Sequence, residues 1–63
     1  MIQSGSIWGN SNRFVIVEEI FNGVVIFTWT EKGRLFTGLR YVDVFLEIFV
    51  PASKCKTCGK YFK

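Results

Sequence analysis

A mainly β fold is predicted for this chain: a small bent sheet or partly open barrel with one short helix near residues 42–49. Residues 13–21 and 24–29 are rich in β-branched and aromatic side chains, which favour strands. Between them lies Asn22-Gly23, the preferred pair for a two-residue hairpin turn, because both turn positions need positive φ. Apolar residues make up 49% of the 63 residues, and 17% are aromatic, so one small domain with a dense core is expected.

The remaining strands follow from turn signals. Residues 1–12 are rich in Gly, Ser and Asn, which predicts an irregular lead-in with a short strand around residues 6–8. Glu31-Lys32-Gly33 predicts a second turn, and residues 34–37 predict the third strand of a meander. Gly38 is expected to mark a bend or a bulge.

Two patterns compete over residues 41–50. The spacing of Tyr41, Val44, Phe45, Ile48 and Phe49 fits an amphipathic helix, whereas simple alternation fits a strand equally well. The helix is favoured because it buries both Phe45 and Phe49, and the strand leaves both rings on a wet face. Pro51 is expected to end either element.

Residues 1–50 are therefore expected to form the β module, and residues 51–63 a basic tail. The tail contains four lysines and no acidic residue, whereas residues 1–50 carry one net negative charge. A neutral globule with a basic tail lacks the broad basic face of a duplex DNA binder.

A loose pattern links residues 5–50 to a known group of proteins. It consists of a hairpin and a set of spaced glycine and apolar residues, namely Gly5, Trp8, Gly33, Leu35, Leu39, Phe45, Leu46 and Phe49. The pattern resembles small SH3-like proteins that are common among bacteriophage and prophage gene products. The resemblance implies an SH3-like module of phage origin and a host cytoplasmic location, and it implies no activity.

The tail has a sharper motif. Cys55 and Cys58 have the spacing of a metal-binding knuckle, and together with Gly59, Lys60 and Phe62 they resemble the opening hairpin of the two-cysteine, two-histidine zinc finger. The helix and both histidines of that family are missing. The resemblance therefore implies a zinc-ligand role for Cys55 and Cys58, and it does not imply DNA reading.

The ligand count leaves several readings of the cysteine pair. One chain has no histidine and no third cysteine, so it cannot complete a tetrahedral zinc site from these ligands. A zinc ion shared between two chains, which would link a homodimer, is one hypothesis. A pair of metal-free thiols at the chain terminus is the alternative.

The candidate binding residues are aromatic and basic. An exposed aromatic surface could stack on a ligand, and Trp8 and Trp29 are the best candidates because both adjoin turns or loops. Most of the other aromatic residues, among them Phe14 and Phe27, are expected in the core. The full candidate binding set is Trp8, Trp29, Phe36, Tyr41, Lys54, Lys56 and Lys60.

Catalysis is not expected. The chain has no histidine and no phosphate-cradling glycine loop, and Glu18 and Glu19, adjacent in a strand, are expected to point to opposite faces. No export signal and no apolar run of about 20 residues is present, so a cytoplasmic protein without a membrane span is expected. The leading hypothesis is a small non-enzymatic protein-interaction module, a phage-encoded modulator of a host or phage protein. A single-stranded nucleic-acid-binding module and a structural subunit of a larger assembly are the alternatives.

Overall fold

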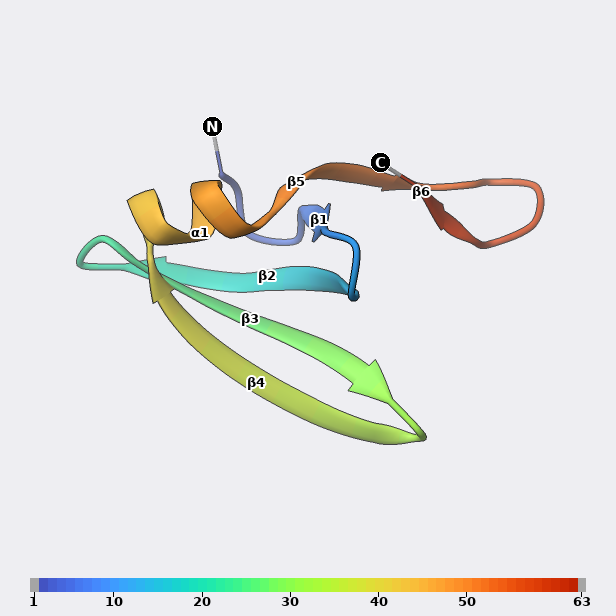
Figure 1. Cartoon of the computed structure of the whole chain (residues 1–63), viewed down its shortest axis with the longest axis horizontal. Helices are drawn as coiled ribbons and strands as arrows, with labels where there is room; N and C mark the ends of the chain where they lie inside the picture. The colour runs from blue at the N-terminus through green and yellow to red at the C-terminus, as the bar shows by residue number, and fades with distance from the viewer. Residues whose placement is uncertain (1, 63) are drawn as a thin grey trace.

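A computed structural model describes residues 2–62 and shows one antiparallel six-stranded open sheet with a single short helix (Figure 1). The mainly β class and the short helix are thereby confirmed. The strand order across the sheet is β4-β3-β2-β1-β5-β6. The elements are β1 (Ile7–Gly9), β2 (Phe14–Phe21), β3 (Val24–Glu31), β4 (Arg34–Tyr41), α1 (Val42–Ile48), β5 (Val50–Lys54) and β6 (Tyr61–Phe62).

Two tight hairpins build the β2–β3–β4 meander. Asn22 and Gly23 have φ of 51° and 75°, and Lys32 and Gly33 have φ of 51° and 76°. Positive φ at both central positions is what a type I′ turn requires, and its twist matches the twist of the strands that it joins. The first turn is as predicted. The second is one residue shorter than expected, because Glu31 still pairs with Arg34 in the ladder.

Helix α1 covers one face of the sheet, called here the inner face. Phe45 is fully buried and Phe49 is 5% exposed, which confirms the predicted burial of both rings. The Phe45 ring centroid lies 5.3 Å from Trp8 of β1 and 5.3 Å from Phe27 of β3, so α1 packs across the two strands on either side of β2. The remaining core consists of Ile2, Val15, Val17 and Val25. No helix among residues 2–62 is long and apolar enough to cross a membrane.

The chain after α1 continues as a β-strand although it contains a proline. Pro51 was expected to end the preceding element, and α1 indeed ends at Ile48, but Pro51 itself lies inside β5 and pairs with Trp8. The expected boundary after residue 50 therefore falls within β5, whose first residues belong to the main sheet. β5 continues into a two-stranded hairpin with β6, in which Lys54 pairs with Tyr61.

Gly38 is neither a bend nor a bulge, contrary to the sequence-based prediction. It pairs with Phe27 in an unbroken β3–β4 ladder. A Cβ atom at this position would lie 2.6 Å from the Phe27 ring and 3.1 Å from the Trp29 ring. The absence of a side chain therefore makes room for two inner-face aromatic rings.

The bulge lies instead in β2. The β2–β3 register shifts between Val17 and Glu19, and it places Glu18 at the extra position. Glu18 accepts a hydrogen bond from Thr28 Oγ1 at 2.9 Å, and Glu19 pairs with Ile26. Because a bulge interrupts the alternation of side chains, the two carboxylates share the face opposite α1, and the expectation of opposite faces was wrong.

Candidate interaction surface and metal half-site

The face opposite α1, called here the outer face, is apolar and uncovered. Cross-strand partners share a face, so the ladders arrange its residues in rows. Tyr41 and Val24 form one row with Phe21, and Leu39 and Ile26 form the next. Leu35 is 71% exposed, Leu39 55% and Tyr41 67%. The half-buried or exposed apolar members of the outer face are Ile7, Phe14, Ile16, Phe21, Val24, Ile26, Leu35, Leu39, Tyr41, Val50 and Tyr61.

This face continues to a free strand edge. β4 lies at one end of the strand order, so one side of its eight residues has no strand partner within residues 2–62. Natural sheets blunt such edges with charges, bulges or short strands, because a bare edge recruits another strand. Here only Arg34 and Arg40 carry charge, and the ladder to β3 is free of bulges.

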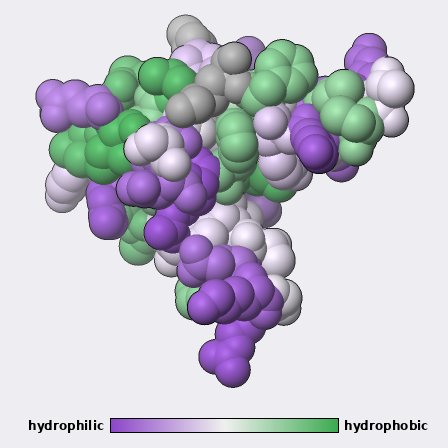
Figure 2. All heavy atoms as spheres, turned by 45° about the vertical axis from the view of Figure 1, so that its right-hand side comes forward, coloured by the Kyte–Doolittle hydropathy of each residue, from purple (hydrophilic) through white to green (hydrophobic). Residues whose placement is uncertain are grey.

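A notch opens where the meander separates from the rest of the sheet. The β2–β3 ladder ends at the Ile16–Thr28 pair, whereas β3 and β4 stay paired as far as Glu31 and Arg34. The β3–β4 hairpin therefore projects beyond the sheet, and its tip is the hydrophilic lower projection in Figure 2. The notch beside it has a volume of about 340 Å³.

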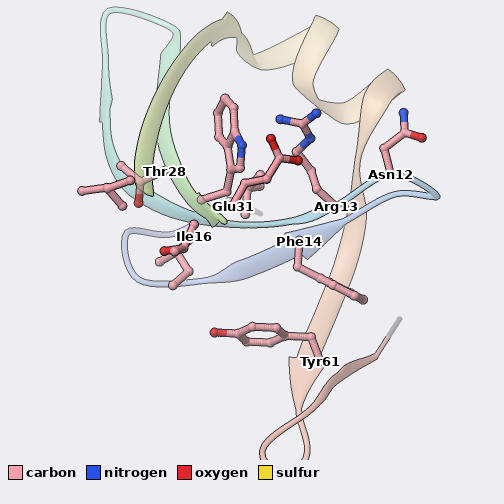
Figure 3. Close-up of a pocket in the computed structure, with 11 residues that line it drawn as sticks. Asn12, Arg13, Phe14, Ile16, Thr28, Glu31 and Tyr61 are labelled. Carbon is pink, nitrogen blue, oxygen red and sulfur yellow. The ribbon is translucent and has the colours of Figure 1, made fainter. Parts of the chain in front are cut away.

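Both faces contribute to the walls of this notch. Figure 3 shows Arg13 and Glu31 on one side of β2, with Phe14, Ile16 and Tyr61 on the other. The Phe14 ring centroid lies 5.4 Å from that of Tyr61. Phe14 is thus half-buried on the outer face and is not the core residue predicted from the sequence. Its contact with Tyr61 holds the base of the β5–β6 hairpin against β2.

The four aromatic candidates for ligand binding do not form one surface. Trp8 is only 6% exposed and its indole N–H donates to Ser6 Oγ at 3.0 Å, so the expectation of an exposed Trp8 was wrong. Its position beside a loop gave no sign that α1 would cover it. Trp29 and Phe36 stack with centroids 5.7 Å apart on the inner side of the projecting hairpin. Tyr41 lies on the outer face at the other end of β4.

Trp29 forms the floor of a smaller inner cleft. The Arg13 guanidinium lies 4.7 Å from the centre of the Trp29 ring, a cation–π distance. The Trp29 Nε1 atom is buried and has no hydrogen-bond partner among the described residues. Arg40 also lines this cleft, whose volume is about 260 Å³. The cleft therefore presents two cationic side chains around an aromatic floor.

The Cys-x-x-Cys loop forms a folded knuckle at the end of the β5–β6 hairpin. Cys55 N–H donates to Lys60 O at 2.7 Å, and Gly59 N–H donates to Cys55 O at 2.9 Å. Gly59 has φ of 75°, the left-handed conformation that glycine adopts without strain. Cys58 N–H points at the Cys55 sulfur, with a nitrogen–sulfur distance of 3.5 Å. The backbone thus holds the two cysteines in one tight loop.

These hydrogen bonds change the chemistry of one thiol. Donation from the Cys58 backbone, then from the Cys58 side chain and the Thr57 backbone, holds the pKa of Cys55 below its ordinary value. Hydrogen bonds to the charged form stabilise a thiolate, which is the metal-binding species. Cys55 is half-buried and Cys58 is exposed.

The described residues provide only half of a zinc site. Within residues 2–62 no group of three or more His, Cys, Asp or Glu side chains is placed to hold a metal ion. Lys54, Lys56 and Lys60 surround the cysteines in the sequence, and Lys54 Nζ lies 5.9 Å from the Tyr61 ring. The lysine candidates therefore belong to the knuckle and are separate from the aromatic candidates on β3 and β4.

Sequence reasoning missed the outer-face residues Leu35, Leu39 and Glu18. Alternation of apolar residues along β4 was visible, but both faces of this strand look apolar, and nothing local shows which one α1 covers. Comparison of the chain with protein-family models, with curated proteins and with solved structures finds no significant match. The function of the chain is therefore inferred from its own surfaces.

Proposed function

We propose that this protein is a non-enzymatic interaction module that binds an extended segment of a partner protein along the outer face and the free edge of β4. The observation that carries the proposal is the set of exposed apolar side chains on the outer face, which extends to an eight-residue edge strand. Large exposed apolar patches are rare on monomeric soluble proteins and mark interaction sites.

A partner strand added to β4 forms both backbone hydrogen bonds and apolar side-chain contacts. Its backbone pairs with the free N–H and C=O groups of the edge, which gives affinity. Its side chains on one face then extend the rows that Leu35, Leu39 and Tyr41 begin. The notch beside Ile16 and Leu35, with a volume of about 340 Å³, has room for one anchoring side chain of the partner, and such anchors are common at the centres of protein interfaces.

Charge defines the partner segment further. Glu18 and Glu19 lie together on the outer face, next to the rows formed by Ile16 and Ile26. Both carboxylates are on β2, two strands in from the β4 edge, so the part of the partner segment that lies over this face, and not the part paired with β4, brings them into a drier environment. A basic side chain opposite them offsets the cost. The segment is therefore expected to be extended, mainly apolar and to carry at least one Lys or Arg.

The test compares two charge-introducing variants. Leu39→Glu alters the outer face, and Leu46→Glu is the matched control, because Leu46 is 51% exposed on α1 away from that face. Tagged wild type and both variants are incubated with lysate of the source cells, and bound proteins are identified by mass spectrometry. A partner retained by wild type and Leu46→Glu but lost from Leu39→Glu supports the proposal.

Hydrogen exchange on the recovered complex then locates the contact. New amide protection is expected in β4 and not in α1. A partner that survives Leu39→Glu, or protection confined to α1 or the β5–β6 hairpin, would contradict the proposal. The identity of the partner also tests the hypothesis that the module modulates a host or phage protein.

A single-stranded nucleic-acid-binding module is the second candidate, and one observation favours it. Arg13 and Arg40 line the inner cleft together with Trp29, and the Phe36 ring stacks on Trp29. Aromatic platforms with cationic neighbours bind nucleotide bases without sequence preference. In a Trp8→Phe variant, quenching of Trp29 fluorescence by oligothymidylate that weakens as salt rises would support it. Unchanged fluorescence at low salt would exclude it.

A further inference from the structure

We propose that Cys55 and Cys58 from two copies of this chain bind one zinc ion, which joins the copies through their β5–β6 hairpins. The site uses no residue of the outer face or of the β4 edge. The zinc site is therefore independent of the partner-binding surface, and an experiment can disprove one of the two proposals without affecting the other.

The first support is the shape of the loop. Cys58 N–H is directed at the Cys55 sulfur, Gly59 turns the chain with positive φ, and two backbone hydrogen bonds close the loop between residues 55 and 60. A metal-binding loop needs both thiolates on one side of a tight turn, with amide groups that neutralise the sulfur charge. The backbone of this loop is therefore already folded, with one amide group directed at a sulfur atom, and zinc does not have to order the backbone.

The second support is the number of ligands. Structural zinc sites are tetrahedral and closed, with sulfur ligands about 2.3 Å from the metal. Each chain supplies two thiolates, and within residues 2–62 no carboxylate or third cysteine joins them. A second copy supplies an identical pair, and a two-fold axis through the metal relates the two pairs. The partner copy thus completes a site that one chain leaves half made.

The third support is charge. Four thiolates around a divalent zinc ion leave two net negative charges at the centre of the dimer contact. Lys54, Lys56 and Lys60 of each chain flank the two cysteines in the sequence, and residues 51–62 carry no acidic side chain. Two basic hairpins repel each other without the metal, whereas the zinc–thiolate centre attracts both. The dimer is therefore expected to depend on zinc.

Accessibility is the fourth support. The β5–β6 hairpin projects from one end of the molecule, away from α1 (Figure 1). Cys58 is exposed at its end, and the Phe14–Tyr61 contact holds its base on β2. Two copies can therefore meet at this end while both sheets stay folded.

Native mass spectrometry of protein purified from zinc-supplemented culture tests the metal and the oligomer together. The expected species is a dimer with one zinc ion, which becomes a metal-free monomer after treatment with a chelator. Titration of the apo protein with Co²⁺ is expected to saturate at one ion per two chains, with the absorption of a tetrahedral thiolate site. A monomer with one zinc, a metal-free monomer after zinc addition, or a dimer that resists chelation would overturn the proposal.

Variants separate ligand loss from misfolding. Cys55→Ser and Cys58→Ser are each expected to lose both zinc and the dimer mass, with an unchanged far-ultraviolet circular dichroism spectrum. Thr57→Ala is the matched control, because it lies between the cysteines and keeps the backbone N–H. It is expected to retain zinc and the dimer.

A mixing experiment shows whether both copies donate ligands. Wild type is combined with a mass-tagged Cys55→Ser/Cys58→Ser protein in the presence of zinc. Only wild-type dimers are expected, because the double variant supplies no ligand. Mixed dimers would place the contact on the sheet and overturn the shared site. Leu39→Glu, which should abolish partner binding, is expected to keep the zinc dimer.

Discussion

The inner and outer faces of the sheet are built by the same strands and are similarly apolar, but only the inner face is covered. On β3, Phe27 points toward α1 and is 4% exposed, whereas Leu39, on the outer face of the neighbouring strand, is 55% exposed. Burial of apolar area contributes about 25 cal/mol per Å² to stability. The inner face gains this free energy within the monomer, whereas the outer face gains it only when a partner covers it. One face therefore serves stability and the other recognition.

The largest effect on stability is expected when one aromatic ring is removed from the inner face. Phe45→Ala is expected to lower the free energy of unfolding by about 3–5 kcal/mol, because it leaves a cavity among Trp8, Phe27 and Phe49. Leu35→Ala on the outer face is expected to change it by less than about 0.5 kcal/mol. Urea unfolding followed by circular dichroism measures both.

Because the loss at Phe45 is comparable to the whole stability of a small domain, Phe45→Leu provides a milder inner-face change. It should fold cooperatively with a midpoint between those of wild type and Phe45→Ala. Equal losses at positions 45 and 35 would mean that the outer face is also part of the core.

Two glycine substitutions sharpen the contrast. Gly38→Ala places a Cβ 2.6 Å from the Phe27 ring, and Gly9→Ala places one 2.5 Å from the Phe14 ring. Phe27 is packed under α1 and cannot move, so Gly38→Ala is expected to cost about 1–3 kcal/mol. Phe14 is at the outer face and can rotate away, so the cost of Gly9→Ala should be smaller. Thermal melts that rank the two in the reverse order would break the distinction between a packed and an open face.

The Asn22-Gly23 turn sets the register of both faces at once. Gly23→Val is expected to destabilise the fold by about 1 kcal/mol or more, because a β-branched residue resists the φ of 75° at this position. Val24→Ala, next to the turn but with no special φ, is the comparison. An unchanged melting temperature for Gly23→Val would show that the turn tolerates another conformation.

The smallest effect lies outside both faces, at the knuckle. In a Cys58→Ala variant, which keeps the backbone N–H that points at Cys55, iodoacetamide reacts with one thiol. Its rate should reach half-maximum at lower pH in the native protein than in denaturant, because the hydrogen bonds that lower the pKa of Cys55 are lost on unfolding. Melting temperature should not change. Identical pH profiles in both conditions would mean that the knuckle does not form in solution.

The parts of the fold that were predictable depend on neighbours in the sequence. Both hairpin turns follow from local residues that tolerate positive φ, and the burial of Phe45 and Phe49 follows from helical spacing. The bulge at Glu18 and the pairing of Pro51 with Trp8 depend on distant strands. No local pattern distinguishes a proline that ends an element from one that lies in a strand beside β1.

The candidate sites divide in the same way. Cys55 and Cys58 are recognisable from their spacing alone, since only two residues separate them in the chain. The outer face is not recognisable, because its exposure depends on which face α1 covers. Trp8 was expected at the surface for this reason, and it lies in the core because Phe45 packs against it. The binding of zinc, of a protein or of a nucleic acid stays a prediction.

The pairing of β1 with both β2 and β5 has a consequence for how the chain folds. The meander closes through two tight turns, so its contacts form between residues close in sequence and cost little loop-closure entropy. The β1–β5 ladder joins residues near opposite ends of the chain and therefore forms late. During synthesis, β1 emerges long before its β5 partner exists. The edge of β1 that awaits β5 is then open, and the lead-in and its apolar Trp8 remain exposed until the last strands leave the ribosome.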